Sequence, residues 1–282
     1  MGTISRSWAL VKQSFQILRA DKELMLLPVL SAISCVLVTG VVIGGGAFAF
    51  LPVIKSSLAE NPNWEPSTPM VVAGMFVFYA VNYCVIVFFN TALVGAASIR
   101  LEGGDPTLQD GLRIAWQRKG RILEWALLSA TVGVILKLLE ERLDLLGRIV
   151  VRLIGLAWTL ASYFVVPVLA LEDLGPMDAL KRSAELFRKN WGEQVTGGFS
   201  FGLIFFVLAL PGIAFPVVGL MLGAGIGLFV GLGLMVLYFV LLAVVSAATQ
   251  GIFAAALYRY AKSGEVSKGY SAENFSMAWQ PK

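Results

Sequence analysis

Residues able to do acid–base or metal chemistry are scarce in this sequence. Histidine is absent, which removes the commonest general base and the commonest metal ligand. Cys35 and Cys84 lie in apolar runs and lack the C-x-x-C spacing of a zinc or redox site. No nucleophile stands beside a base, and no glycine-rich phosphate loop occurs. We therefore expect a protein that is not an enzyme and that binds no metal or cofactor.

Charged residues near position 144 are the first candidates for ligand binding. Lys137 and Glu141 are four residues apart, as are Asp144 and Arg148, so each pair can meet on a helix surface. Arg148 and Arg152 share a helix face. We expect a salt-bridged rim at the membrane surface, and the alternative is a lipid-headgroup or anion site at Arg148 and Arg152.

Acidic residues also precede two prolines that suit the first position of a helix. Asp105 stands before Pro106, and Glu172 and Asp173 stand shortly before Pro176. Two adjacent carboxylates could bind a cation, but acidic side chains at a helix start more often cap the helix or offset its dipole. We expect the second role.

Polar residues within the long apolar runs are few: Asn82, Asn90, Thr91, Ser162, Thr249 and Gln250. Hydrogen bonds between helices are the simplest role for such side chains. A polar lining for a passage, formed by Asn82, Asn90 and Gln250, is the alternative. No carboxylate lies in the middle of a run, which disfavours an ion-coupled pump.

The elements that position these residues are membrane-spanning helices. The chain has 57% hydrophobic and 14% charged residues, whereas soluble domains carry about 25% charged residues. A span needs ~20 apolar residues. The runs predict an all-α, polytopic transmembrane bundle with spans at 24–51, 70–99, 122–139 and 149–171 and two spans between 196 and 258.

The stretch 196–258 is too long for one span, and its break is ambiguous. Either Pro211–Pro216 or the glycine-rich segment Gly223–Gly227 can interrupt it. We favour the second, with Pro211 as a kink, because it gives two spans of similar length. Three short spans are the alternative.

Most of the 22 lysine and arginine residues fall in segments 1–23, 100–121, 172–195 and 259–282. The positive-inside rule places all four in the cytoplasm, with both termini there and an even number of spans. This distribution explains the net charge of +4 without nucleic acid as a partner. The first span is not expected to be a cleaved signal, because Asp21 and Glu23 precede it and its run is too long.

Three short amphipathic helices are predicted before the odd-numbered spans. Trp8 and Phe15 lie on the apolar face of the first, and Phe187 and Trp191 on that of the third, opposite basic residues. This composition is typical of helices that lie in the membrane interface.

A threefold internal repeat is suggested by matches at an offset of 70, such as Pro106 with Pro176 and Arg118 with Arg188. The repeat units would be 1–101, 102–171 and 172–258, followed by a tail at 259–282, all within one transmembrane domain, 1–282. Such repeats occur in transporters, although duplication can build any membrane bundle.

Glycines at four-residue spacing predict close helix packing. They are Gly40 and Gly44 in the first span, and Gly219, Gly223, Gly227 and Gly231 in the last two. Glycine at i and i+4 lets two backbones approach, either within one chain or between copies in a homo-oligomer.

Several short segments are distinctive: Ser5–Trp8, Val166–Asp173, Gly175–Pro176, Ala179–Ser183, Asn190–Gly192, Ala256–Ala261 and Gly264. Through these residues the whole chain resembles a family of six-span bacterial and archaeal membrane proteins with no assigned function. The chain is also loosely similar to the membrane domains of some glycerophosphodiester phosphodiesterases, without their catalytic domain. The resemblance implies the cytoplasmic membrane of a prokaryote and transfers no functional residues.

These observations favour a non-enzymatic integral membrane protein that acts as a scaffold or through lipid or protein contacts, with membrane lipids as partners. The alternative is a transporter or channel for a lipid or small molecule.

Overall fold

The computed structural model describes residues 3–189, 202–223 and 225–271, and these residues form helices with no strand. Six helical segments in this part of the chain are long and apolar enough to cross a membrane: Lys22–Glu60, Thr68–Glu102, Lys119–Arg142, Leu145–Leu171, Gly202–Leu222 and Ile226–Ser263. The prediction of an all-α protein with six potential spans is confirmed. The chain divides into unit 1 (1–28, 93–111 and 185–282) and unit 2 (29–92 and 112–184).

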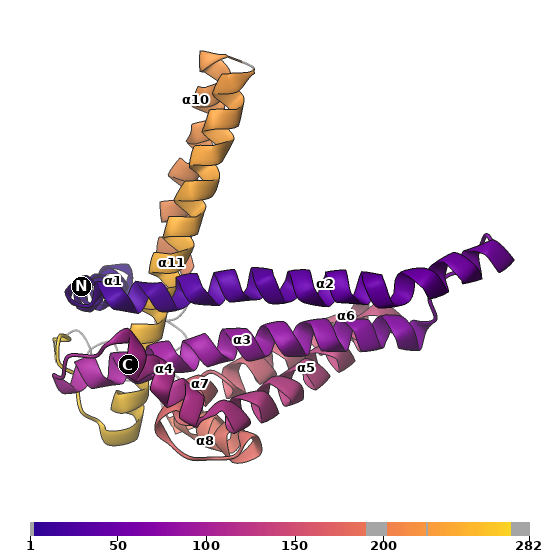
Figure 1. The fold of residues 1–282 in the computed structure, drawn as a ribbon. Coiled ribbons are helices and arrows are strands. Elements are labelled where there is room, and N and C mark those ends of the chain that lie inside the picture. Colours follow the sequence, from indigo (N-terminus) through magenta and orange to yellow (C-terminus); the bar gives the residue numbers. More distant parts are fainter. Residues whose placement is uncertain (1–2, 190–201, 224, 272–282) are drawn as a thin grey trace. The chain divides into compact units, whose positions relative to one another are not determined.

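Unit 2 is built on long helices that run side by side (Figure 1). Its elements, some of which continue into unit 1, are α2 (Leu26–Glu60), α3 (Thr68–Glu102), α4 (Leu108–Gln117), α5 (Lys119–Arg142), α6 (Leu145–Ala161), α7 (Val165–Leu171) and α8 (Pro176–Lys189). The Thr39 hydroxyl donates a hydrogen bond to Asn82 Oδ1 at 3.0 Å and joins α2 to α3. Trp125 of α5 stacks on Trp158 of α6, with ring centroids 5.6 Å apart.

Two prolines in these helices behave differently. Pro52 lies inside α2, and the helix continues past the expected end of the first span near Leu51 to Glu60. Pro167, by contrast, follows a break between α6 and α7. A continuous helix would press its ring against the carbonyl of Tyr163. The freed Phe164 amide donates instead to Ser183 Oγ of α8 at 2.9 Å, which satisfies the backbone at the break.

The last two spans form a hairpin within unit 1. Residues 202–209 are helical, and they are followed by the 3-10 turn η2 (Leu210–Ile213), α10 (Ala214–Leu222) and α11 (Ile226–Ser263). The favoured break at Gly223–Gly227 is confirmed, and Pro211 lies in η2 within the fifth span. Gly223 has φ +151°, a conformation that L-residues with a side chain rarely adopt. The expected start of this span near Thr196 lies outside the described residues.

Glycines bring α10 and α11 together along the hairpin (Figure 1). A Cβ atom on Gly219 would overlap the carbonyl oxygen of Gly227, and one on Gly231 would lie 2.9 Å from Pro216 Cα. These contacts are with backbone atoms, which cannot rotate away. The small residues therefore set the distance between the two helices.

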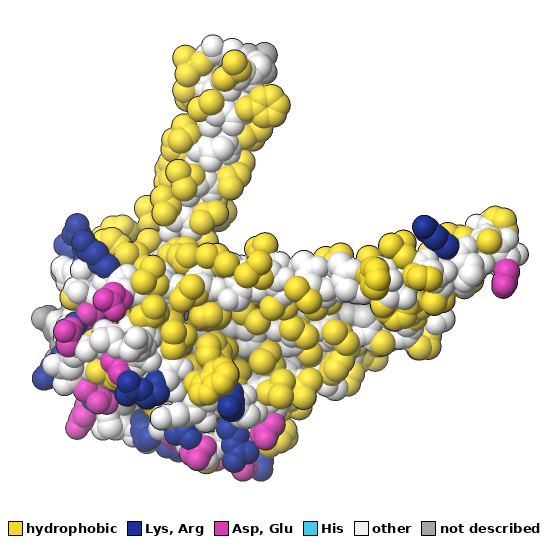
Figure 2. Space-filling model, in the orientation of Figure 1, with side chains coloured by type: hydrophobic (Ala, Val, Ile, Leu, Met, Phe, Trp, Pro, Cys, Tyr) yellow, Lys and Arg dark blue, Asp and Glu magenta, His cyan; other side chains and the backbone are white. Residues whose placement is uncertain are grey.

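Large apolar side chains are exposed along the spans of both units. Phe48 on α2 is 85% exposed and Leu222 on α10 is 81% exposed. Figure 2 shows hydrophobic side chains along α2 and along the α10–α11 hairpin. Apolar surface on this scale would be unstable in water and is expected where the solvent is hydrocarbon.

A compact core in unit 1, here called the helix-end core, lies where long helices extend past the membrane length. At 1.5 Å per residue the 38 residues of α11 span about 57 Å, whereas the hydrocarbon is ~30 Å thick. The last third of α11 packs with the end of α3 and with α1 (Thr3–Ala20) and η1 (Lys22–Met25). Its buried residues include Leu10, Leu18, Leu24, Ala96, Ala97, Leu101, Ala248, Ile252, Ala255, Ala256 and Tyr258.

We predict that Gly231→Ala destabilises the hairpin, whereas Gly233→Ala on the same helix does not. The first substitution forces a Cβ against Pro216, and the second places it where no atom lies within 4 Å. Overpacking costs roughly 1–3 kcal/mol, and alanine is favoured over glycine in an open helix by about 1 kcal/mol. Thermal unfolding in detergent measures the difference, and equal midpoints for the two variants would contradict the prediction.

Candidate functional site

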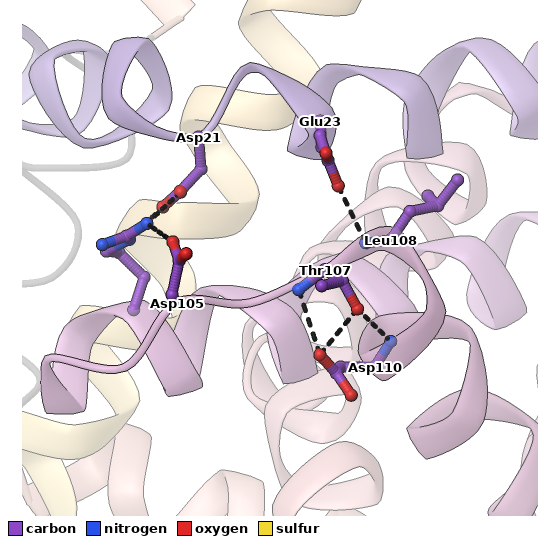
Figure 3. A network of polar contacts seen from close by, with 7 residues as sticks. Asp21, Glu23, Asp105, Thr107, Leu108 and Asp110 are labelled. Atoms are coloured by element: carbon purple, nitrogen blue, oxygen red, sulfur yellow. Dashed lines mark hydrogen bonds and ion pairs between the residues drawn. The ribbon is translucent and has the colours of Figure 1, made fainter.

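The densest polar cluster shown at the helix ends of unit 1 is centred on Arg100 (Figure 3). The Arg100 guanidinium donates to both carboxylate oxygens of Asp21 and to Asp105 Oδ1, the latter at 2.5 Å. The side chain of Asp21 is 6% exposed and that of Arg100 is 26% exposed. A buried carboxylate requires such a partner, because an unpaired charge there would be strongly destabilising.

Neighbouring carboxylates in the same view bind backbone amides at the start of α4. Glu23 Oε2 accepts a hydrogen bond from the Leu108 amide at 3.3 Å. Asp110 Oδ2 accepts from the Thr107 amide at 3.0 Å, and Thr107 Oγ1 accepts from the Asp110 amide at 3.2 Å. This reciprocal pattern is a capping box. Thr107, rather than the expected Asp105, therefore caps the helix.

The Arg100 cluster thus joins helices and offers no free catalytic group. Its carboxylates bind a guanidinium or cap a helix. Within the described residues, no three His, Cys, Asp or Glu side chains are placed to hold a metal ion. Two further acidic residues lie in unit 2, in the turn before Pro176. Asp173 pairs with Arg118 at 2.6 Å, and Glu172 pairs with Arg182 at 3.6 Å.

The segment after α11 closes this end of unit 1 and was not anticipated. The Lys268 amide donates to the Leu101 carbonyl at 3.3 Å, and the Tyr270 hydroxyl lies 2.6 Å from Ser14 Oγ of α1. Desolvation raises the pKa of Tyr270 above its usual value. The signal for this packing in the sequence is weak, because Tyr270 is one of several aromatic residues in the tail 259–282.

We predict that Arg100→Met lowers the free energy of unfolding by about 3–5 kcal/mol, because it leaves the buried Asp21 carboxylate unpaired. Arg259→Met is the control: Arg259 pairs with Glu102 at 2.7 Å, and Glu102 is 65% exposed. Such an exposed pair contributes roughly 0–1 kcal/mol. Denaturation in mixed micelles gives both values, and Asp21→Asn should restore part of the loss in the Arg100→Met background.

The best candidate for a binding site is a charged cavity of about 710 Å³ between α5 and α6 in unit 2. It brings together Lys137, Glu140 and Glu141 from α5 with Arg148 and Arg152 from α6. Arg148 and Arg152 were expected to share a face, and both line this cavity. Gly133 and Gly155 leave room between the two helices.

The ion pairs at this cavity differ from those expected. Arg152 Nε donates to Glu140 Oε1 at 2.9 Å, whereas Arg148 Nε donates to the Leu143 carbonyl at 3.0 Å. Asp144 accepts from the Gly147 amide at 3.0 Å and caps α6, which draws it away from Arg148. The structure shows neither expected pair, Lys137–Glu141 or Asp144–Arg148. Among the described residues, Lys137 and Glu141 form no ion pair.

A second cavity of about 360 Å³ shares Gly133 and Lys137 with the first. Tyr79 and Tyr83 of α3, Ser129 of α5 and Trp158 of α6 line it. Ser129 Oγ is buried and finds no hydrogen-bond partner in the described part of the chain. We call the two adjoining cavities the α5–α6 groove. Its charged part continues into an aromatic, partly polar part within the spans, with Lys137 at their junction.

The other predicted site residues are dispersed. Gly40 and Gly44 face open space, since a Cβ at either would meet no atom within 4 Å. Asn82 Nδ2 donates to the Phe78 carbonyl at 3.0 Å, and Asn90 is exposed. In unit 1, Gln250 is exposed and donates to Ser246 Oγ at 2.7 Å.

The aromatic residues of the predicted interfacial helices differ in burial. Trp8 and Phe15 are 51% and 39% exposed, whereas Phe187 is 5% exposed and packs within the protein. Trp191 lies outside the described residues. The position of these helices in a membrane interface stays a prediction.

A comparison with protein families matches residues 69–268, from the start of α3 to the segment that follows α11, to DUF6159, described as a family of unknown function. The chain belongs to this family. The expected resemblance to a six-span family without an assigned function agrees with this membership. No curated protein matches the chain. The DUF6159 match includes every residue of the α5–α6 groove and assigns a role to none of them.

Proposed function

We propose that this chain is a non-enzymatic integral membrane protein that binds phospholipid through the α5–α6 groove. The observation that carries the proposal is the groove itself: three cationic and two acidic side chains at one end and tyrosine and tryptophan rings at the other, on helices long enough to span a membrane. A headgroup phosphate would occupy the charged part, and an acyl chain would lie along the exposed apolar faces of α5 and α6.

The chemistry of the lining supports a phosphate-bearing ligand. Arg148 uses Nε for the Leu143 carbonyl, which leaves the Nη atoms of its guanidinium to donate to phosphate oxygens. Lys137 has no carboxylate partner among the described residues and lies at the junction of the two cavities. Lys137 is exposed on the protein surface, and a lysine within the length of a span is a functional-site candidate because its charge is costly in hydrocarbon without a partner.

The aromatic part of the groove suits the boundary between headgroup and hydrocarbon. Tyrosine and tryptophan combine an apolar ring with a polar atom and gather at membrane interfaces for this reason. Trp158, stacked on the buried Trp125, supplies a flat wall. Ser129, whose hydroxyl has no partner in the described chain, offers a hydrogen bond to a glycerol or ester oxygen.

We predict that Lys137→Met and Arg148→Gln each weaken phospholipid binding roughly tenfold, since a hydrogen bond to a charged group contributes about 1.5–3 kcal/mol. Arg142→Gln is the matched control, because Arg142 is exposed at the end of α5 and does not line the groove. Native mass spectrometry of delipidated protein titrated with phosphatidylglycerol measures the bound fraction.

Diacylglycerol, which lacks the phosphate, serves as the competing ligand in the same titration. The proposal requires phosphatidylglycerol to bind more tightly than diacylglycerol in the wild type. Equal binding of the two lipids, or an equal loss in all three variants, would show that the groove does not recognise phosphate.

The proposed location is the cytoplasmic membrane of a prokaryote, with both termini in the cytoplasm. The distribution of lysine and arginine supports this orientation. It would place the segment between α2 and α3, and the turn between α5 and α6, on the opposite side of the membrane. The groove would then bind lipid of the outer leaflet.

Cysteine labelling in intact prokaryotic cells tests this orientation. In a chain with Cys35 and Cys84 replaced by alanine, we expect Asn63→Cys to react with a membrane-impermeant thiol reagent and Glu265→Cys to react only after permeabilisation. Both positions are exposed, and they lie in the α2–α3 connection and in the segment after α11. Reaction at both positions, or at Glu265→Cys alone, would overturn the orientation.

Transport of a lipid or small molecule is the second candidate function. The hydroxyl groups of Tyr79, Tyr83 and Ser129 within the spans favour it, because polar atoms can line a passage. Flux of labelled phospholipid between the leaflets of vesicles containing the protein would support transport over static binding. The homo-oligomer, the threefold repeat and the similarity to membrane domains of glycerophosphodiester phosphodiesterases stay predictions.

A further inference from the structure

An apolar pocket of about 520 Å³ lies in unit 1 and shares no lining residue with the α5–α6 groove. One wall comes from α1 and includes Val11, Lys12 and Phe15. The other walls come from Phe205, in the helical segment 202–209, and from α11, including Leu241 and Val245. Small-molecule pockets typically measure ~300–1,000 Å³, so this pocket has the volume of a binding site.

Two hydroxyl groups in the pocket walls are already engaged. The Tyr238 hydroxyl donates to the Leu208 carbonyl, and the Thr249 hydroxyl donates to the Val245 carbonyl one turn earlier in α11. These groups therefore do not call for a polar ligand. A hydrocarbon chain is the occupant that such walls stabilise most, because it gives up no hydrogen bond when it leaves water.

Among the described residues that line this pocket, Lys12 is the single charged one. Its side chain is exposed, and it pairs with no carboxylate of the described chain. An ammonium group on a four-carbon stem can cover an apolar wall while its charge remains in water. The described lining thus combines one cation with apolar walls and includes no carboxylate.

We propose that this pocket binds a long-chain carboxylate, with the acyl chain against the apolar walls and the carboxylate paired with Lys12 Nζ. A single-chain ligand fits a cavity of 520 Å³ better than a two-chain phospholipid, half of which would remain outside. One cation likewise matches one carboxylate. The proposed phospholipid site in the α5–α6 groove shares no residue with this pocket, so either site can exist without the other.

Filling the pocket gives the sharpest test. Leu241→Trp places an indole in the pocket, whereas Leu237→Trp, one turn earlier in α11, places the same ring outside its lining. The two leucines are 57% and 55% exposed, so the substitutions perturb the fold to a similar degree. Thermal unfolding of both variants checks this match before ligand binding is compared.

Binding of oleate to the delipidated full-length chain in detergent is measured by native mass spectrometry. We expect one oleate per chain in the wild type and in Leu237→Trp, and at least tenfold weaker binding in Leu241→Trp. Lys12→Gln should weaken binding about tenfold, whereas Lys22→Gln, at an exposed position outside the pocket, should not.

Oleyl alcohol and phosphatidylglycerol distinguish the alternatives. If oleyl alcohol binds as tightly as oleate, the carboxylate is not recognised by Lys12 and the proposal fails. The proposal also fails if phosphatidylglycerol displaces oleate at equal concentration, because the pocket would then be a binding site for bilayer phospholipid. If Leu241→Trp and Leu237→Trp weaken oleate binding equally, oleate binds outside this pocket and the proposal fails.

Discussion

Close packing of small residues between the end of α3 and the last third of α11 is the constraint on which unit 1 depends. Ala96 and Ala97 on α3, and Ala248, Ala255 and Ala256 on α11, are buried, and the Leu93 side chain fills the space beside Gly251. In hydrocarbon the hydrophobic effect does not drive helices to associate. At the helix ends, however, water surrounds the chain, and burying α1 and η1 on this alanine-lined surface becomes favourable.

Charge is used in two ways in the molecule. Around Arg100 every carboxylate has a guanidinium or backbone amide, so the cluster orders η1 and the start of α4 against the end of α3. At the α5–α6 groove the pairing is incomplete, because Glu140 pairs with Arg152 while Lys137 and Glu141 form no ion pair in the described chain. A fully paired cluster stabilises a fold, whereas unpaired charges beside a cavity favour recognition of a ligand.

The spans could be predicted from the sequence because their signal is local: each is a run of apolar residues of sufficient length. The break after Leu222 was also predictable, since Gly223 can adopt a φ that other residues avoid. Whether Pro52 or Pro167 would accompany a helix break could not be predicted. A break depends on a distant partner that satisfies the freed backbone, as Ser183 Oγ does for the Phe164 amide. Likewise, the four-residue spacing of Asp144 and Arg148 suggested an ion pair. It could not reveal that the Asp144 carboxylate caps α6 instead of pairing with Arg148.

The packing of Tyr270 against α1 has a consequence for biosynthesis. Unit 1 is assembled from residues 1–28, 93–111 and 185–282, so contacts such as Ser14–Tyr270 join residues 256 apart in the chain. Helix α1 is synthesised long before Tyr270, so this contact forms only after the intervening residues have been made. Until then its apolar face remains open to chaperones or to the membrane surface, and unit 2 has the opportunity to fold first.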